Sequence, residues 1–259
     1  MLRKRMIGVV TVKQGWVVQS FGFKQYLPIG KVDCILENLD RWGIDEILVQ
    51  VIDRSSKQSG PDYQLLEQIS RLRLATPITY SGGIRHEKDA VAVIKTGADR
   101  VCVDALIGDV REVEAISYRL GAQAVVASMP IVMLNNNPVW FDYRIGKIKK
   151  MTPEIKSLFE CDVISEIFMI DKENEGKDNG FNKKLLDYFV GISTPIIAFG
   201  GISSADDMSS LLGMDNISAV AIGNFLNYKE HAVQNYKLAI TGISIRPECY
   251  LATTGVNND

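Results

Sequence analysis

The chain has 259 residues, 46% of them hydrophobic, and its 29 Lys and Arg residues are almost balanced by 31 Asp and Glu residues, which gives a net charge of −2. This balance argues against nucleic acid or an anionic membrane surface as the main partner. A chain of this length and apolar content can bury one large core, and α/β barrels of about 200–250 residues are a common single domain of this size.

From the N-terminus onward, short β-branched or apolar runs alternate with amphipathic stretches. The runs predict eight strands, at Met6–Val12, Glu46–Ile52, Pro77–Tyr80, Arg100–Val103, Ala124–Ser128, Glu166–Ile170, Pro195–Phe199 and Ala219–Ile222. The stretches predict helices that include Val32–Trp42, Tyr63–Leu72, Glu87–Thr96, Val110–Leu120 and Lys183–Val190. Eight strands that alternate with helices are typical of a (β/α)8 TIM barrel, so we expect one α/β domain over residues 1–259.

Two segments fall outside this alternation. Residues 135–150 begin with Asn-Asn-Asn-Pro and contain VWFDYRIGK, which predicts a hairpin inserted after the fifth strand. The tail from about residue 253 is polar and is expected to lie outside the packed domain.

Signals of export, membrane insertion and metal binding are missing from the sequence. Residues 1–18 carry Arg3, Lys4 and Arg5 near their start but no long apolar run, and no segment reaches the ~18 apolar residues of a membrane span. We therefore expect a cytoplasmic protein. Four cysteines without a C-x-x-C pair predict buried free thiols and neither a metal nor a cofactor, at Cys34, Cys102, Cys161 and Cys249.

One motif occurs twice in the chain. TPITYSGGI at Thr76–Ile84 is matched by TPIIAFGGI at Thr194–Ile202, and the two Gly-Gly pairs lie 118 positions apart. Leu65-Leu66 and Leu185-Leu186 are 120 positions apart. A nearly constant spacing of this size is too long for a solenoid repeat and predicts a barrel of two duplicated halves.

Each Gly-Gly pair follows a predicted strand, where backbone N–H groups can approach an anion without interference from a Cβ atom. Because phosphate is commonly held at the carboxyl ends of barrel strands, two phosphate sites are predicted. The second-half site comprises Gly200, Gly201, Gly223 and Asn224, and the first-half site comprises Gly82, Gly83, Asp104 and Ala105. Asp104 is unfavourable beside a dianion unless Arg85 or His86 offsets it, and the glycines could equally serve only the turns.

Several motifs in order resemble one family. VKxGxVV near the N-terminus, GIDE from Gly43, SGGIR from Ser81, GxQAVVA from Gly121 and the TPIIAFGGISS segment resemble HisF, the cyclase subunit of imidazole glycerol phosphate synthase. The resemblance implies a barrel that binds a bis-phosphorylated ribulosyl substrate at its carboxyl face. It also implies that ammonia arrives through the barrel from a HisH-like glutaminase docked underneath, and that Gly176 helps to hold a phosphate.

The chain departs from that family at its catalytic pair. The resemblance places the two catalytic aspartates at Thr11 and Pro130, and neither of these side chains can transfer a proton at ordinary pH. A further family aspartate is replaced by Val51. If the strand continued, Asp53 would share the face of Val51 and could substitute for it.

Four charged residues match the family's ammonia gate at the opposite end of the barrel, at Arg5, Glu46, Arg100 and Glu166. They could equally form an ion cluster that only plugs the base. Asp99 matches a position at the glutaminase interface, although a plain surface role fits it as well.

Three hypotheses remain open, and they leave the chain's own enzymatic activity undecided. In the first, the chain resembles a divergent, WbuZ-like subgroup of HisF proteins, to which the FKQYLPIG stretch at Phe23–Gly30 is similar. Such a subunit would pass ammonia to a separate sugar amidotransferase in lipopolysaccharide or nonulosonic acid synthesis. In the second, it is a genuine cyclase, a lyase of histidine biosynthesis. In the third, it is a non-catalytic scaffold that activates a glutaminase.

Overall fold

The computed structural model describes residues 3–228 and 230–247, apart from the side chain of residue 105. The tail from about residue 253 and Cys249 therefore lie outside the described residues. Within the described part of the chain, no helix is long and apolar enough to cross a membrane.

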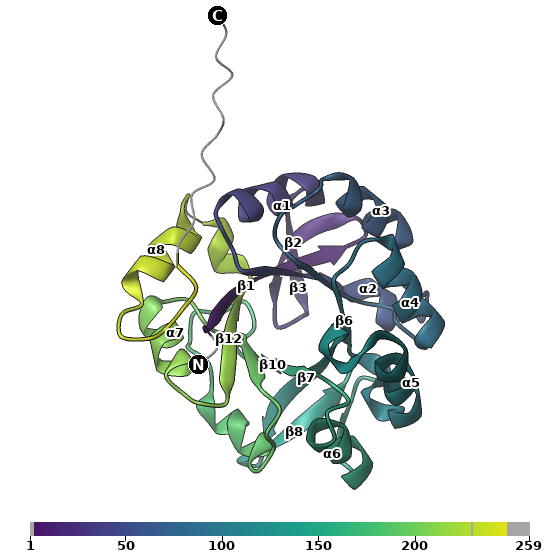
Figure 1. Ribbon diagram of the computed structural model, residues 1–259. Coiled ribbons are helices and arrows are strands. Elements are labelled where there is room, and N and C mark those ends of the chain that lie inside the picture. Colours follow the sequence, from purple (N-terminus) through teal and green to yellow (C-terminus); the bar gives the residue numbers. More distant parts are fainter. Residues whose placement is uncertain (1–2, 229, 248–259) are drawn as a thin grey trace, which may run out of the picture.

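Among the described residues, eight parallel strands close into a barrel, which confirms the predicted TIM-barrel fold (Figure 1). Strand β1 pairs with both β12 and β4, and β10 pairs with both β11 and β7, so the ring has no open edge. The barrel strands are β1 (Arg5–Lys13), β4 (Glu46–Val51), β5 (Ile78–Ser81), β6 (Arg100–Val103), β7 (Val125–Leu134), β10 (Glu166–Asp171), β11 (Ile196–Phe199) and β12 (Ile217–Ile222).

Helices surround the strands, each with an apolar face turned inward. In α3, for example, Leu65, Leu66 and Ile69 are buried, and Asp62 caps the helix by accepting a hydrogen bond from the Leu65 N–H at 3.2 Å. The α-helices are α1 (Val32–Arg41), α2 (Ile52–Ser55), α3 (Tyr63–Arg71), α4 (Glu87–Thr96), α5 (Val110–Leu120), α6 (Pro153–Glu160), α7 (Ala205–Leu212) and α8 (Ala232–Ala239). Short 3-10 helices lie at η1 (Ala105–Gly108), η2 (Ala122–Ala124), η3 (Lys183–Phe189) and η4 (Asn224–Asn227).

Two apolar clusters hold the barrel together. Side chains alternate along β1, so that Met6 and Val10 join the large cluster between strands and helices, while Ile7 and Val9 join a smaller one. The smaller cluster fills the barrel interior and comprises Ile7, Val9, Leu48, Cys102, Val126, Phe168, Ile170, Ile197, Phe199, Ala219 and Ala221.

Two hairpins extend from the carboxyl end of the barrel. The hairpin predicted at residues 135–150 is confirmed, since β7 runs on to Leu134 and turns back into β8 (Asn137–Asp142) and β9 (Lys147–Lys149). The turn uses Asn135 and Asn136 at φ 49° and 62°, a conformation that Asn tolerates. The other hairpin, β2 (Trp16–Phe21) with β3 (Gln25–Gly30), was not predicted.

The two halves of the barrel repeat the same backbone contacts. A Cβ atom at Gly82 would overlap the carbonyl oxygen of Val51, and one at Gly200 would overlap the carbonyl oxygen of Asp171. Asp171 lies 120 positions after Val51. The glycines therefore have a structural role in both turns, whatever they bind.

Two sequence predictions are wrong. Residues 183–189 form a 3-10 helix and not the α-helix expected there, in a short segment that ends just before Gly191 at φ 82°. Cys102 is buried as expected, but Cys34 and Cys161 are exposed, because they lie on α1 and at the end of α6 and not in a strand.

Candidate active site

A cavity of about 300 Å³ opens at the carboxyl end of the barrel, where the chemistry of this fold takes place. Strand ends supply its floor, and the two hairpins supply most of its roof. Its lining comprises Phe23, Lys24, Tyr26, Gln50, Val51, Ile52, Ser55, Ser56, Ser81, Gly82, Asp104, Phe141, Tyr143 and Lys172.

The floor of the cavity carries buried polar atoms without partners. Gln50 and Ser81 are register neighbours on β4 and β5 and are 5% and 1% exposed. Among the described residues, Gln50 Oε1 has no hydrogen-bond partner, and Ser81 Oγ has none beyond a weak contact with the Cys102 thiol. Burial, and then the Asp104 carboxylate, raise the pKa of the nearby Cys102 thiol, so this thiol stays protonated. A neutral thiol forms only a weak hydrogen bond with the Ser81 hydroxyl. Buried polar atoms of this kind are rare and indicate a ligand or ordered water.

Aromatic rings form the roof. The Phe23 and Tyr143 rings meet edge to face with centroids 5.7 Å apart, and Phe141 and Tyr143 do so at 5.5 Å. Tyr26 donates its hydroxyl to the Phe23 carbonyl at 2.6 Å, while the buried Tyr143 hydroxyl has no partner among the described residues. Burial, followed by the charges of Glu175 and Asp104, raises the pKa of Tyr143 well above its usual value, so its hydroxyl remains a neutral donor.

Two lysines border this roof. Lys172 Nζ lies 4.4 Å from the centroid of the Phe141 ring. Burial lowers the pKa of Lys172, and the positive charge of Lys24 lowers it further. Within the described residues, the salt bridges include neither Lys24 nor Lys172.

The first-half Gly-Gly turn is hydrogen-bonded internally. The Gly83 N–H donates to Ser55 Oγ at 2.9 Å, and that hydroxyl donates to Asp104 Oδ2 at 2.8 Å. Arg85 and His86, which were considered as charges to offset Asp104, are both turned to Asp89. The Arg85 Nε lies 2.8 Å from Asp89 Oδ2, and His86 Nδ1 accepts from the Asp89 N–H at 3.3 Å as the cap of α4.

The second-half turns hold the first hairpin. Asn224 Nδ2 donates to the Ser20 carbonyl at 2.8 Å, and the Ser20 N–H donates back to Asn224 Oδ1 at 3.2 Å. Glu175 Oε2 accepts from Ser20 Oγ and from the Phe23 N–H, both at 3.0 Å. Gly176 lies against the same Ser20 carbonyl, where a Cβ atom would overlap it. Ser20, Glu175 and Asn224 form a latch, named here the hairpin latch, that sequence reasoning did not foresee.

The catalytic positions of the resemblance lie within β1 and β7, which continue past them to Lys13 and Leu134. Thr11 is 5% exposed, and Pro130, which is buried, is the register partner of Ile170. Asp53 does not share a strand face with Val51, as was expected if the strand continued, because β4 ends at Val51 and Asp53 lies in α2. Its carboxylate is 3.5 Å from Lys57 Nζ, one helical turn away, and Asp53 is not among the cavity-lining residues.

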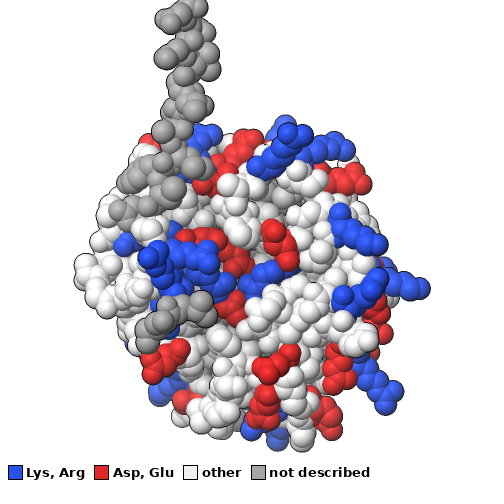
Figure 2. All heavy atoms as spheres, in the orientation of Figure 1, with Lys and Arg blue, Asp and Glu red and all other residues white. Residues whose placement is uncertain are grey.

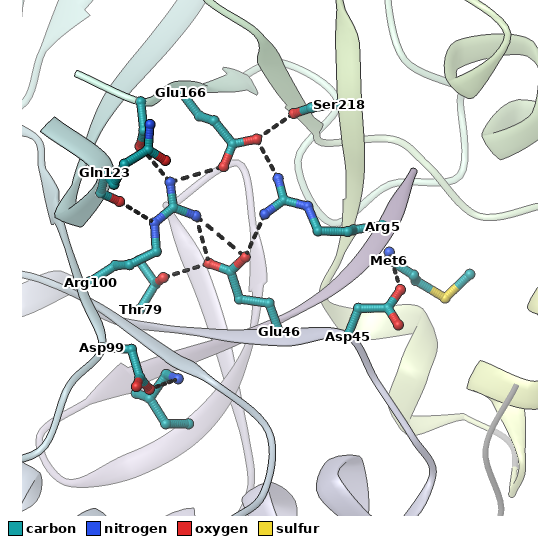
Figure 3. A network of polar contacts seen from close by, with 12 residues as sticks. Arg5, Met6, Asp45, Glu46, Thr79, Asp99, Arg100, Gln123, Glu166 and Ser218 are labelled. Carbon is teal, nitrogen blue, oxygen red and sulfur yellow. Dashed lines mark hydrogen bonds and ion pairs between the residues drawn. The ribbon is translucent and has the colours of Figure 1, made fainter. Parts of the chain in front are cut away.

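A ring of four charges closes the opposite, amino-terminal end of the barrel (Figure 3). Arg5 Nη1 lies 3.1 Å from Glu46 Oε2, and Arg5 Nη2 pairs with Glu166. Arg100 completes the ring at 3.3 Å from Glu46 and 2.9 Å from Glu166. The four side chains, here called the basal ring, are 5–16% exposed.

Neutral partners complete the basal ring. Thr79 Oγ1 donates to Glu46, Ser218 Oγ donates to Glu166, and Arg100 Nε donates to the Gln123 carbonyl at 3.2 Å. Figure 2, in the orientation of Figure 1, shows acidic and basic side chains meeting at the centre of the strand ring. Asp99 is exposed nearby, and its Oδ2 accepts from the Ile78 N–H at 2.7 Å, so it helps to fix the start of β5.

The closed barrel, its duplicated halves and the cavity at its carboxyl end define a (β/α)8 barrel, a fold in which active sites lie at that end. The chain matches the family model described as "Histidine biosynthesis protein" over residues 5–232. It belongs to this family.

Named relatives extend over most of the chain. The "Putative imidazole glycerol phosphate synthase subunit hisF2" of Vibrio vulnificus is 29% identical over 235 residues, 90% of this chain and 86% of that protein. A protein of the same name from Campylobacter jejuni is 26% identical over 95% of this chain and 99% of its own length. The imidazole glycerol phosphate synthase subunit HisF of Bacillus licheniformis is 27% identical over 95% of this chain and all of its own length. These relatives confirm the resemblance to HisF.

Proposed function

We propose that this chain is a cyclase-like subunit that receives ammonia from a HisH-like glutaminase and delivers it to the cavity at the carboxyl end of the barrel. The basal ring is the observation that carries the proposal. Four charges enclosed at the entrance of an apolar interior are costly unless paired, and paired charges can separate and reform to pass a small neutral molecule. Asp99 would lie at the glutaminase-facing end.

Polar atoms along the interior support a path from the basal ring to the cavity. Ser128 Oγ is buried without a partner among the described residues. Its neighbours Ala127 and Met129 pack in the outer cluster, so strand alternation turns Ser128 into the barrel. With Ser81 and Gln50 it offers ammonia hydrogen-bonding partners in an otherwise apolar interior.

In this role the chain is specialised for amidination in surface polysaccharide synthesis, and the ammonia is passed on to a sugar amidotransferase. Ring closure by a cyclase needs positioned groups that transfer protons, and Thr11 and Pro130 supply none. Two relatives that carry the hisF2 name are similar to the chain over nearly its whole length. A cyclase of histidine biosynthesis remains the second candidate, favoured by the equally extensive similarity to the Bacillus licheniformis HisF.

One assay tests the partnership with a glutaminase, and a second separates the two candidates. The chain is mixed with a HisH-like glutaminase from the same genome, and glutamine hydrolysis is compared with that of the glutaminase alone. We expect a stable complex and faster hydrolysis; no complex and no stimulation would overturn the proposal. The chain alone is then given the ribulosyl bisphosphate substrate and excess ammonium salt at alkaline pH. No imidazole product is expected, whereas turnover at the rate of an ordinary cyclase would establish the second candidate.

A further inference from the structure

We propose that the cavity binds a small ring-bearing anion. Its anionic group lies between Lys24 and Lys172, its ring packs against the aromatic roof, and a hydroxyl or N–H group at its far end donates to Gln50 Oε1. This inference rests on the proposed function only in taking the cavity as the place to which ammonia is delivered.

The floor supplies the first reason. Gln50 is 5% exposed, and its Oε1 atom is an acceptor without a donor among the described residues. A buried acceptor without a donor lowers the stability of the protein. A ligand that brings a donor to Gln50 Oε1 forms a hydrogen bond that the protein alone does not make. The adjoining Ser81 hydroxyl can donate or accept and fits the same end of the ligand.

The roof supplies the second reason. Phe23, Phe141 and Tyr143 come from two different hairpins, yet their rings contact one another over the cavity. An aromatic ring packs favourably against another ring, either offset-stacked or edge to face, so this roof favours a ligand that carries a ring. The volume of about 300 Å³ is at the lower end of the range for small-molecule sites, which limits the ligand to about one ring and its substituents.

The lysines supply the third reason. Lys24 and Lys172 both line the cavity and repel each other, since the charge of Lys24 helps burial to lower the pKa of Lys172. A carboxylate or phosphate between them would remove this repulsion and form charge-assisted hydrogen bonds. Both anions share this chemistry.

The Gly-Gly turns explain why one anionic group is inferred and not two. At the first turn, the Gly83 N–H already donates to Ser55, whose hydroxyl faces the Asp104 carboxylate. At the second, Asn224 and Glu175 hold the Ser20 backbone and side chain in the hairpin latch. A ligand anion at the first turn would meet the Asp104 carboxylate, and one beside Gly176 and Asn224 would meet the Glu175 carboxylate of the hairpin latch. Lys24 and Lys172 instead bring two positive charges to the cavity, which outweigh there the nearby charges of Glu173 and Glu175 once an anion lies between the two lysines.

The test is calorimetric titration of the full chain with defined probes at neutral pH. 4-Hydroxybenzoate and 4-hydroxyphenyl phosphate carry the ring, the donor and the two kinds of anion. 4-Hydroxybenzyl alcohol lacks the charge, benzoate lacks the donor, and fructose 1,6-bisphosphate is the two-phosphate probe. We expect at least one of the two ring anions to bind, and to bind roughly tenfold or more tightly than the uncharged alcohol and the bisphosphate. The tighter of the two anions identifies whether carboxylate or phosphate is preferred.

Variants assign each part of the ligand. Lys24→Ala and Lys172→Ala should each weaken binding of the ring anions roughly tenfold, while Lys95→Ala, an exposed lysine on α4, should leave it unchanged. Gln50→Leu should weaken 4-hydroxybenzoate but not benzoate. Circular dichroism spectra like that of the wild type show that each variant is folded.

The proposal is overturned if neither ring anion binds, or if the alcohol binds as tightly as they do. It is also overturned if the bisphosphate binds more tightly and keeps its affinity in Lys24→Ala and Lys172→Ala, because the phosphates would then lie at the Gly-Gly turns. No glutaminase or ammonium is present in this titration. Absence of binding in the titration therefore does not count against ammonia delivery. A negative result in the glutaminase assay likewise does not change the result of the titration.

Discussion

Arg100 Nη2 lies 2.9 Å from Glu166 Oε2 at the base of the barrel, and the same guanidinium reaches Glu46 at 3.3 Å. One cation thus pairs with two carboxylates, which are 4% and 7% exposed. Arg5 repeats both contacts from β1, so each charge of the basal ring is shared between two partners.

Removing one arginine should leave buried carboxylate charge uncompensated. Arg100→Ala is expected to lower the free energy of unfolding by about 2–4 kcal/mol, at the lower end for a broken buried ion pair because the ring is partly exposed. Urea unfolding at neutral pH measures the change, with Lys95→Ala as the surface control. An effect no larger than that of the control would mean that water already compensates the two glutamates.

The glycine turns are expected to be structurally equivalent. Gly83 and Gly201 have φ of 72° and 75°, and a Cβ atom on them would overlap the carbonyl oxygens of Gly60 and Gly180. Gly83→Ala and Gly201→Ala should each lower the free energy of unfolding by about 2 kcal/mol or more, by similar amounts. Gly30→Ala is the control, since its φ is not positive and its Cβ atom would meet open space. Clearly unequal costs in urea unfolding would count against structural equivalence of the two halves.

The eight barrel strands were predictable because each is a short apolar run between turn residues. The errors there are at the ends: Pro77 and Pro195 lack the N–H that a paired strand position needs, so β5 and β11 begin one residue later than expected. The first hairpin was missed because its sequence is polar and contains Pro28, which gives no clear strand pattern.

Contacts between distant residues were beyond the reach of the sequence. Ser20 and Asn224 are 204 positions apart, and no local pattern shows that they meet. The premise for Asp53 failed for a related reason, because the alternation of a strand cannot be extended past its last residue, Val51. The basal ring was located only through the resemblance, and its closed geometry became visible in the fold.

The hairpin latch should make stability depend on pH. Burial raises the pKa of Glu175 above its usual value, and hydrogen bonds from Phe23 and Ser20 lower it only in part. The folded protein therefore holds this proton more tightly than the unfolded chain, so stability is lost as the pH rises from the ordinary value of about 4.3 through the higher folded pKa. In Glu175→Gln, whose amide oxygen can still accept both hydrogen bonds, this fall in stability should shrink.

Glu175→Ala is the complementary variant. It leaves the Ser20 hydroxyl and Phe23 N–H without their acceptor and should cost about 1–3 kcal/mol. Hydrogen exchange of residues 16–30 measures the loosening of the first hairpin, and urea unfolding between acidic and neutral pH measures the linkage. Identical pH profiles for the wild type and Glu175→Gln would show that Glu175 is not the titrating group.

The buried amide of Gln50 should reduce stability in the absence of ligand. Gln50→Leu replaces an acceptor that has no partner among the described residues by an apolar side chain of similar size, beside the apolar interior to which Leu48 belongs. We expect the free energy of unfolding to rise by about 1 kcal/mol. Thermal unfolding in phosphate-free buffer measures it, with the exposed Gln64→Leu on α3 as the matched control. A loss of stability in Gln50→Leu would mean that the amide already has a hydrogen-bonded water.

Opening the basal ring should let ammonia escape. Arg5→Ala removes one of the two cations that close the entrance, leaving Glu46 and Glu166 paired through Arg100 alone. In a complex with the HisH-like glutaminase, glutamine hydrolysis is expected to continue while more of the nitrogen appears as free ammonium in the medium. The measurement adds the sugar amidotransferase and its sugar acceptor to the complex and uses glutamine labelled at its amide nitrogen. It compares labelled ammonium in the medium with labelled sugar product, and Lys95→Ala is the control. Unchanged transfer in Arg5→Ala, with glutaminase stimulation intact, would instead favour a scaffold that activates its partner and conducts nothing.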